Sequence, residues 1–429
     1  MHVDMCTSMV KSRFLSNPHD LGVVAVGFSG GQGKAGVDDG PVALIESGLI
    51  SQLSQDLGYK IHGDEEVQVH SYSDIVPAED PPIRNMKNPR SVSAVTAKIA
   101  DQVYSHAREG RMVLTLGGDH SIAIGTIAGT AKAIRERMGR EIAVIWVDAH
   151  ADINTPETSG SGNIHGMPVA FVTGLAKEER PECFGWLKED NLLSIRKLVY
   201  IGLRDVDAAE KRILRENGIK AFSMFDIDRH GIGRVVEMAL GHIGNDTPIH
   251  LSFDVDALDP MWAPSTGTPV RGGLTIREGD YICEALHETG NLVAVDLVEV
   301  NPRLAADTPL GPTETVRAGS SIVRCALELI CRIALLTPYM NTLAIAGFSS
   351  MMQSTLSTIV VGVMTSKLSG RTFDLDSDVL RYDTKDVNLS IPLSVIRQRP
   401  ITRSDFEDYE PETAQARLTI PLPTTLFEG

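Results

Sequence analysis

Three short apolar segments, each followed closely by acidic residues or histidine, constrain the fold of this chain more than any other feature. The segments are residues 112–116, 142–147 and 249–253. Each pattern predicts a buried strand, because uninterrupted apolar runs of this length are typical of strands covered on both faces. The polar residues that follow therefore lie at strand ends, and open α/β sheets bind their ligands beyond the carboxyl ends of their strands.

Strand and helix patterns alternate along most of the chain. The predicted strands are residues 21–26, 67–72, 112–116, 142–147, 198–201, 219–223, 249–253 and 292–298. The predicted helices are residues 40–57, 92–108, 121–137, 208–217, 232–243, 275–289 and 316–327. This alternation predicts an α/β fold with a mainly parallel sheet of about eight strands and helices on both of its sides.

Composition narrows the class of protein. The 429 residues include 42% hydrophobic residues, enough for a sizeable core, and carry a formal net charge of -16. Nucleic-acid binders usually present a basic face, so this charge argues against nucleic acid as a partner and is compatible with a cationic substrate. Five scattered cysteines without a C-x-x-C pair indicate neither a disulfide framework nor a zinc knuckle. Since the amino terminus has no apolar secretory segment, we expect a cytoplasmic protein, with a mitochondrial location left open.

The strand ends carry the ligands of a predicted metal centre. These are His120, Asp148, His150, Asp152, Asp254 and Asp256. If the backbone stays extended past residue 147, alternation places Asp148, His150 and Asp152 on one side. Six ligands are too many for one zinc ion, and a carboxylate-rich set suits manganese or another hard divalent ion, with aspartates bridging two ions. Any one aspartate could instead be a turn or cap residue, but three strand ends would then have to coincide.

A glycine-rich segment, residues 27–36, follows the first predicted strand. It matches a phosphate-binding loop only in part, because Gly33 and Lys34 are followed by Ala35 where that motif has Ser or Thr. We therefore expect a flexible loop near the rim of a pocket and no nucleotide.

Four longer motifs occur at the strand ends and in the polar loop after residue 152. They are residues 117–121 (GGDHS), 148–154 (DAHADIN), 161–166 (SGNIHG) and 252–256 (SFDVD). Together they resemble the signatures of the ureohydrolase family, specifically of fungal-type arginases, over roughly residues 20–330. The resemblance implies the three-layer αβα arginase fold, two Mn²⁺ ions per subunit and a homo-oligomer, either trimer or hexamer. It also implies hydrolysis of L-arginine to L-ornithine and urea, in arginine catabolism and the urea cycle, by a hydroxide that bridges the ions.

The same resemblance assigns roles to individual residues. The six candidate ligands would hold the two ions. His165 resembles the family's proton shuttle, Glu299 resembles the carboxylate that pairs with the substrate guanidinium, and Asp152 would also stabilise the leaving amino group. The residues that resemble contacts to the amino acid head are Asn154, Ser159, Ser161 and Asn163 for the α-carboxylate, Asp207 and Glu210 for the α-ammonium, and Thr268 at a further pocket position.

Two alternatives stay open. Another ureohydrolase, such as an agmatinase or guanidinobutyrase, shares the metal residues but need not hold an α-amino acid head, and here the loop 154–163 resembles that of an arginase. The second alternative is a non-catalytic regulator that binds metal or arginine. His165 and Glu299 beside all six ligands argue against it, because a binder needs no attacking hydroxide.

The resemblance divides the chain into three parts. Residues 1–20 are a variable amino-terminal segment, residues 21–330 a catalytic domain, and residues 331–429 an extension without recognisable family sequence. Residues 333–366 lack charged side chains, but their Ser, Thr and Gln353 argue against a membrane span. We interpret the extension as either disordered or the product of a mis-spliced gene or translated intron, and as dispensable for catalysis.

Overall fold

The computed structural model describes residues 12–63, 67–177, 180, 182–305 and 311–328, together with the backbone of three short strands within residues 372–392. The chain divides into two compact units, which are residues 9–331 and residues 332–429 with residues 1–8. No helix in these described parts is long and apolar enough to cross a membrane.

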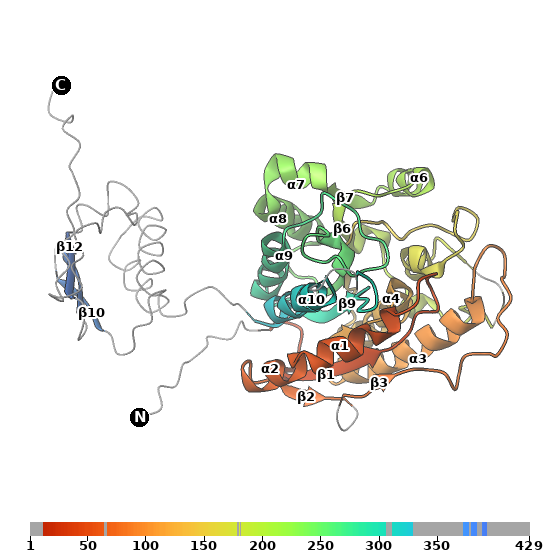
Figure 1. The fold of residues 1–429 in the computed structure, drawn as a ribbon, viewed down its shortest axis with the longest axis horizontal. Helices are drawn as coiled ribbons and strands as arrows, with labels where there is room; N and C mark the ends of the chain where they lie inside the picture. Colours follow the sequence, from red (N-terminus) through yellow and green to blue (C-terminus); the bar gives the residue numbers. More distant parts are fainter. Residues whose placement is uncertain are drawn as a thin grey trace. The chain divides into compact units, whose positions relative to one another are not determined.

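A single sheet organises the larger unit (Figure 1). Among the described residues its nine strands are β1 (Asn17–Val26), β2 (Lys60–His62), β3 (Val69–His70), β4 (Arg111–Leu116), β5 (Ala143–Val147), β6 (Leu198–Leu203), β7 (Lys220–Ser223), β8 (Ile249–Asp254) and β9 (Leu292–Val298). They lie in the order β2-β1-β4-β9-β8-β5-β6-β7, with β3 also beside β1, and every pairing between them is parallel. β9, the last of them in the sequence, lies between β4 and β8 and joins the two halves of the sheet. The predicted mainly parallel α/β fold is confirmed.

Helices cover both faces of this sheet. They are α1 (Gly40–Glu46), α2 (Leu49–Gln55), α3 (Pro89–Arg108), α4 (Ala123–Met138), α5 (Pro168–Val172), α6 (Ala208–Glu216), α7 (Met224–His230), α8 (Ile232–Ile243), α9 (Ile276–Glu288) and α10 (Gly311–Leu327). Short 3₁₀ helices lie at Val37–Asp39, His120–Ile122, Ile164–Gly166, Glu189–Asn191, Ile195–Lys197 and Val255–Ala257. Successive side chains of β5 fall into separate hydrophobic clusters, with Ile145 and Val147 in one and Val144 and Trp146 in the other. The sheet is therefore the middle of three layers.

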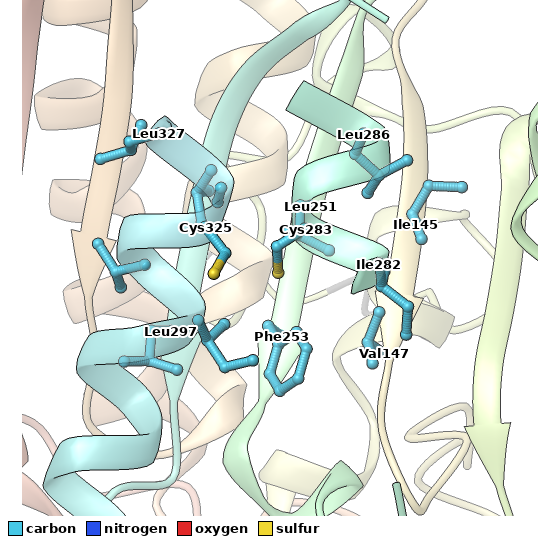
Figure 2. Close-up of a cluster of buried hydrophobic side chains, with 14 of the residues drawn as sticks. Ile145, Val147, Leu251, Phe253, Ile282, Cys283, Leu286, Leu297, Cys325 and Leu327 are labelled. Carbon is cyan, nitrogen blue, oxygen red and sulfur yellow. The ribbon is translucent and has the colours of Figure 1, made fainter. Parts of the chain in front are cut away.

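Figure 2 shows part of the cluster that lies between the sheet and helices α9 and α10. Leu251 and Phe253 of β8 belong to it with Ile282 and Cys283 of α9, and Cys325 of α10 lies beside them. All five side chains are buried. Helices of this length gain most of their stability from such an apolar face rather than from intrinsic propensity.

Several local features differ from the sequence predictions. The predicted helix 40–57 is two helices, because Gly48 has a left-handed backbone (φ 86°), which glycine adopts freely, between α1 and α2. The predicted strand 67–72 shrinks to β3, since Val67 and Tyr72 have positive φ values of 49° and 55°. The elements β2, α5 and α7 were not predicted. They span 3, 5 and 7 residues, too few for a periodic pattern to show.

The smaller unit contains a three-stranded antiparallel sheet. Its strands are β10 (Thr372–Asp376), β11 (Val379–Asp383) and β12 (Asn388–Pro392). No strands were predicted here from the sequence. The uncharged segment 333–366 lies outside the described residues, so the interpretation of the extension stays a prediction.

Helices α3 and α4 pack closely through glycines of α4. A Cβ atom at Gly125 would lie 2.4 Å from the carbonyl oxygen of Thr96, and one at Gly129 would lie 2.4 Å from that of Ala100. Real Cβ atoms do not approach backbone oxygen so closely, so a larger residue would push the two helices apart.

We predict that Gly129→Ala lowers the free energy of unfolding by about 1–3 kcal/mol, the usual cost of overpacking a close contact. The matched control is Gly241→Ala in α8, where an added Cβ would meet nothing within 4 Å. There the better helix propensity of alanine should raise stability by up to about 1 kcal/mol. Equilibrium unfolding of both variants is the measurement, and an equal effect at the two positions would contradict the packing account.

Candidate metal centre

Close backbone contacts bring the chain from β4 to the ends of the neighbouring strands. A Cβ atom at Gly118 would lie 1.8 Å from the carbonyl oxygen of Phe28, so only glycine lets the chain pass there. The backbone N–H of Asp119 then donates to that same oxygen at 3.0 Å. The 3₁₀ helix that follows places the buried ring of His120 against the carboxylates at the ends of β5 and β8.

His120 is the centre of a first cluster of predicted ligands. Its Nδ1 lies 3.1 Å from Oδ2 of Asp254, 3.2 Å from Oδ2 of Asp148 and 3.4 Å from Oδ2 of Asp152. One ligand atom from each of His120, Asp148 and Asp254 lies within 4.8 Å of the other two, so this triad could hold a metal ion.

A second triad consists of Asp148, His150 and Asp256 and meets the same 4.8 Å criterion. Nδ1 of His150 lies 3.2 Å from Oδ2 of Asp256 and 3.4 Å from Oδ1 of Asp148. Asp148 therefore directs one carboxylate oxygen to each histidine. The structure brings all six predicted ligands together, with Asp148 shared between the two triads.

The backbone that achieves this is not the extended strand of the prediction. Beyond Asp148 the chain bends, and Asp152 has a left-handed backbone with φ 48°. The phenol of Tyr200 donates to the carbonyl oxygen of Ala151 at 2.7 Å, and the backbone N–H of Val169 donates to that of Asp152 at 3.0 Å. The assumption of an extended backbone is therefore wrong, because contacts from β6 and α5 turn the chain.

Burial and mutual repulsion determine the protonation of this cluster. Burial raises the pKa of Asp254 well above its ordinary value, and Asp256 and Asp148 raise it further. Burial and the charge of Asp148 also raise the pKa values of Asp152 and Asp256. Burial would raise the pKa of Asp148 too, but hydrogen bonds with the two histidines outweigh it and lower that pKa. Four buried carboxylates and two imidazoles thus fit a pair of hard divalent cations, whose charge offsets the repulsion.

Glu299, directly after β9, is buried beside the first triad. Its backbone is left-handed (φ 63°), and its N–H donates to the carbonyl oxygen of Gly118 at 2.9 Å. Its Oε1 accepts a hydrogen bond from the backbone N–H of His120 at 2.9 Å and lies 3.4 Å from Nδ1 of His165. Burial lowers the pKa of His165, but the hydrogen bond and charge of Glu299 outweigh burial and raise it. Two predicted catalytic residues are therefore in contact.

Two further residues of this site were missed by the sequence analysis. Gln32, in the glycine-rich loop, donates from Nε2 to Oε2 of Glu299 at 2.5 Å. Asp119 is buried and accepts a hydrogen bond from the backbone N–H of Gly31 at 2.9 Å, while burial and Glu299 raise its pKa to about 6. Asp119 stands inside the GGDHS motif, which was the available signal. No local pattern marks Gln32, because its partner lies more than 260 residues away.

The predicted contacts to an amino acid head lie on two segments. Nδ2 of the buried Asn154 donates to Oδ2 of Asp207 at 2.7 Å, and Oδ1 of Asp207 caps α6. Ser159 and Ser161 instead accept hydrogen bonds from backbone groups of their own loop, at residues 162 and 163. Asn154 and Asp207 are thus brought together, whereas the two serines shape the loop.

The remaining predicted pocket residues contact other parts of the site. Thr268 donates from Oγ1 to Oδ2 of Asp256 at 2.9 Å, so it supports the second triad. Glu210 is buried and accepts a hydrogen bond from the backbone N–H of Ile153 at 3.4 Å. Oδ1 of Asn163 accepts a hydrogen bond from Nζ of Lys87 at 3.2 Å.

Comparison with known proteins identifies the family. The model of the arginase family matches residues 19–328. The chain belongs to the arginase family. The arginase of Neurospora crassa is 78% identical over 321 residues, which are 75% of this chain and 89% of that protein, and the arginase of Emericella nidulans is 68% identical over 320 residues, 75% and 97% of the two chains. The resemblance to fungal-type arginases is thereby confirmed.

A solved structure supports the fold assignment. The crystal structure of a cold-adapted arginase from Glaciozyma antarctica matches with a TM-score of 0.59 and 46% identity, over 74% of this chain and 98% of that one. The three-layer arginase-like fold is therefore confirmed, and the chain is an enzyme of the hydrolase class.

Glu210 makes the stability of this region depend on pH. Burial raises its pKa from 4.5 to about 7, so the folded state favours the neutral acid. A raised pKa means that its contribution to stability is complete below pH 4.5 and is lost as pH rises through 7. We predict that Glu210→Ala costs less stability at pH 8 than at pH 5, by up to about 3 kcal/mol.

The control for this comparison is Asp226→Ala. In the capping box of α7, Asp226 occupies the position that Glu210 occupies in the capping box of α6, but hydrogen bonds with Ser223 outweigh burial and lower the pKa of Asp226. Its contribution is lost only as pH falls through that lowered pKa, so the cost of this variant should be equal at pH 5 and pH 8. Thermal unfolding of the metal-free protein at both pH values is the measurement, and a pH-independent cost for Glu210→Ala would refute the prediction.

Proposed function

We propose that this chain hydrolyses L-arginine to L-ornithine and urea at a pair of Mn²⁺ ions. The observation that carries the proposal is the pair of triads that share Asp148 next to the buried Glu299. The relatives described above carry the name arginase. When bound, the ions lower the pKa of a water molecule towards neutrality and so supply the nucleophile.

The donor set supports this choice of metal. The first ion would be held by His120, Asp152 and Asp254, the second by His150 and Asp256, and both by Asp148. Carboxylate oxygens form the majority of these ligands, which favours a hard ion such as Mn²⁺ over ions that prefer thiolate. Thr268 would orient Asp256 through the hydrogen bond to its Oδ2.

Glu299 would bind the guanidinium of the substrate. A planar guanidinium pairs with a carboxylate through two parallel hydrogen bonds, which fixes its orientation. The backbone N–H of His120 and the amide of Gln32 hold the two oxygens of Glu299, one each, so the carboxylate is already oriented before substrate binds. The incoming guanidinium would take over the position of the Gln32 amide.

His165 would supply the proton that the departing amino group needs. Its contact with Glu299 raises the pKa of His165. The imidazole therefore stays protonated at a higher pH than it would if burial acted alone. Asp152 would stabilise the positive charge that forms on the amino group as the C–N bond breaks.

The amino acid head would be held by Asn154 and Asp207. The exposed Asp207 lies at the start of α6 and would attract an α-ammonium group. Asn154, Ser159, Ser161 and Asn163 would receive the α-carboxylate, with Glu210 behind Asp207 in the same capping box. Because the chain belongs to the arginase family of hydrolases, the remaining alternative is another ureohydrolase such as an agmatinase or guanidinobutyrase, which selectivity would reveal.

The wider setting of the enzyme follows from the resemblance to fungal-type arginases. We propose a cytoplasmic homo-oligomer, a trimer or hexamer, that acts in arginine catabolism and the urea cycle. The catalytic domain would be residues 21–330, and residues 331–429 would be dispensable for the reaction.

Metal removal is the first test of the proposal. Prolonged chelation should abolish urea formation, and added Mn²⁺ should restore it. Asp148→Asn should bind both ions more weakly, because a neutral amide is a poorer ligand for a hard cation. The control is Asp205→Asn, whose exposed carboxylate lies 3.8 Å from His150 Nε2 and outside both triads, and which should keep near-native activity. Urea assays with metal analysis decide it, and full activity after verified metal removal would exclude the proposed centre.

Substrate selectivity is the second test. The ratio of kcat/KM for L-arginine to that for agmatine should be large, because agmatine lacks the carboxylate and leaves the polar loop unpaired. Asn154→Ala should lower this ratio by about 10- to 100-fold, since one or two unmade hydrogen bonds to a charged group cost about 1.5–3 kcal/mol. Asn217→Ala, an exposed asparagine at the other end of α6, should leave the ratio unchanged. Equal kcat/KM values for the two compounds in the native protein would assign it to the agmatinases.

A further inference from the structure

A row of side chains crosses the sheet directly below the metal centre. Its members, which we call the support row, are Thr115 of β4, Asp296 of β9, Ser252 of β8, Trp146 of β5 and Tyr200 of β6. Each pairs in register with its neighbour, so all five side chains lie on the same face of the sheet. All are at most 1% exposed.

Three members of the support row contact the chain that carries the predicted ligands. Ser252 Oγ lies 3.0 Å from Nε2 of His120, and the indole of Trp146 donates to Oδ2 of Asp148 at 2.9 Å. The rings of Trp146 and His120 also stack, with centroids 3.9 Å apart and planes inclined by 10°. The third, Tyr200, donates to the carbonyl oxygen of Ala151. Packing therefore fixes the ring plane of His120. Its Nδ1 faces the carboxylates, and its Nε2 faces the serine.

The hydrogen bonds below Ser252 have a definite direction. Its hydroxyl donates to Oδ2 of Asp296 at 3.3 Å, which leaves its oxygen as the acceptor for a proton on His120 Nε2. The same Oδ2 accepts from Oγ1 of Thr126 at 2.6 Å and from Nε2 of His250 at 2.8 Å. This chain of bonds keeps a proton on His120 Nε2, so Nδ1 is the nitrogen that remains to bind an ion.

Asp296 is a costly residue for a core position. Among the described residues no group donates to its Oδ1, although the atom is buried. A buried acceptor without a partner costs about 1–3 kcal/mol, which offsets part of what the hydrogen bonds to its other oxygen contribute to the fold. The three donors that converge on its other oxygen, by contrast, connect it to His120 through one serine.

We propose that Ser252, Asp296 and His250 are positioning residues that hold His120 with Nε2 protonated and Nδ1 directed at the metal centre. The proposal rests on the metal centre put forward above. Partners of this kind on metal-binding histidines typically change metal affinity by about 10- to 100-fold when removed. His150 has no such buried partner in the described structure, since its Nε2 faces only the exposed Asp205 at 3.8 Å. The loss of metal affinity should therefore affect only the ion that has His120 among its ligands.

The test is Mn²⁺ binding to the metal-free full chain. Titration calorimetry measures the binding, and EPR counts the Mn²⁺ that stays free. In Ser252→Ala and in Asp296→Asn, one of the two ions should bind about 10- to 100-fold more weakly and the other as in the native protein. The matched control is Thr115→Val, a near-isosteric change in the support row that touches no predicted ligand, and it should bind both ions normally. Thermal unfolding without metal confirms that each variant is folded. The two variants independently test the hydrogen bonds that connect Asp296 to His120 through Ser252.

Three other outcomes would overturn the proposal, each for a different reason. Native affinity for both ions in both folded variants would exclude the positioning role while leaving the metal centre intact. Equal weakening of both ions would show a general structural effect instead of an effect through His120. A native protein that binds fewer than two Mn²⁺ ions would overturn the metal centre itself, and this inference with it.

Discussion

Electrostatic repulsion among carboxylates that one sheet edge buries together is the constraint on which this site depends. Two such charges 4 Å apart repel by about 4 kcal/mol at an effective dielectric constant of 20. This exceeds the net contribution of about 1 kcal/mol from an ordinary hydrogen bond, so backbone hydrogen bonds alone do not offset several such pairs. Asp148 lies at the centre of the cluster, with one oxygen toward His120 and the other toward His150. Bound cations are the partners that make such a cluster stable at neutral pH.

The parallel register of the sheet is what delivers these groups to one place. Because all the described strands of the larger unit run in the same direction, their carboxyl ends meet at a single edge, and residues in register share a face. Ser252 and Asp296 are partners across β8 and β9, and Trp146 is the partner of Ser252 across β5. The strand pairing that builds the core therefore also determines which side chains contact the predicted ligands His120 and Asp148 from below.

The strand ends and their ligands could be predicted from the sequence because the signal is local. An apolar run followed by Asp or His identifies both the strand and the direction of its polar end, and chance rarely places six such ligands on three runs. The backbone at Asp152 could not be predicted, since a hydroxyl of Tyr200 on another strand turns the chain there. Gln32 and Asp296 were out of reach for the same reason, as their roles exist only once distant strands are paired. The break at Gly48 was predictable in principle, but a helical pattern continues on both sides of it.

The position of β9 has a consequence for how the protein is made. The ribosome synthesises this strand last of the sheet, yet it separates β4 from β8. Until Leu292–Val298 has emerged, the strands already made can form only two partial sheets, each with an unpaired central edge. Exposed apolar edges of that kind are the sites where nascent chains pair wrongly or with one another. The growing polypeptide therefore carries these two unpaired edges until β9 is made, and Glu299 follows directly on that strand.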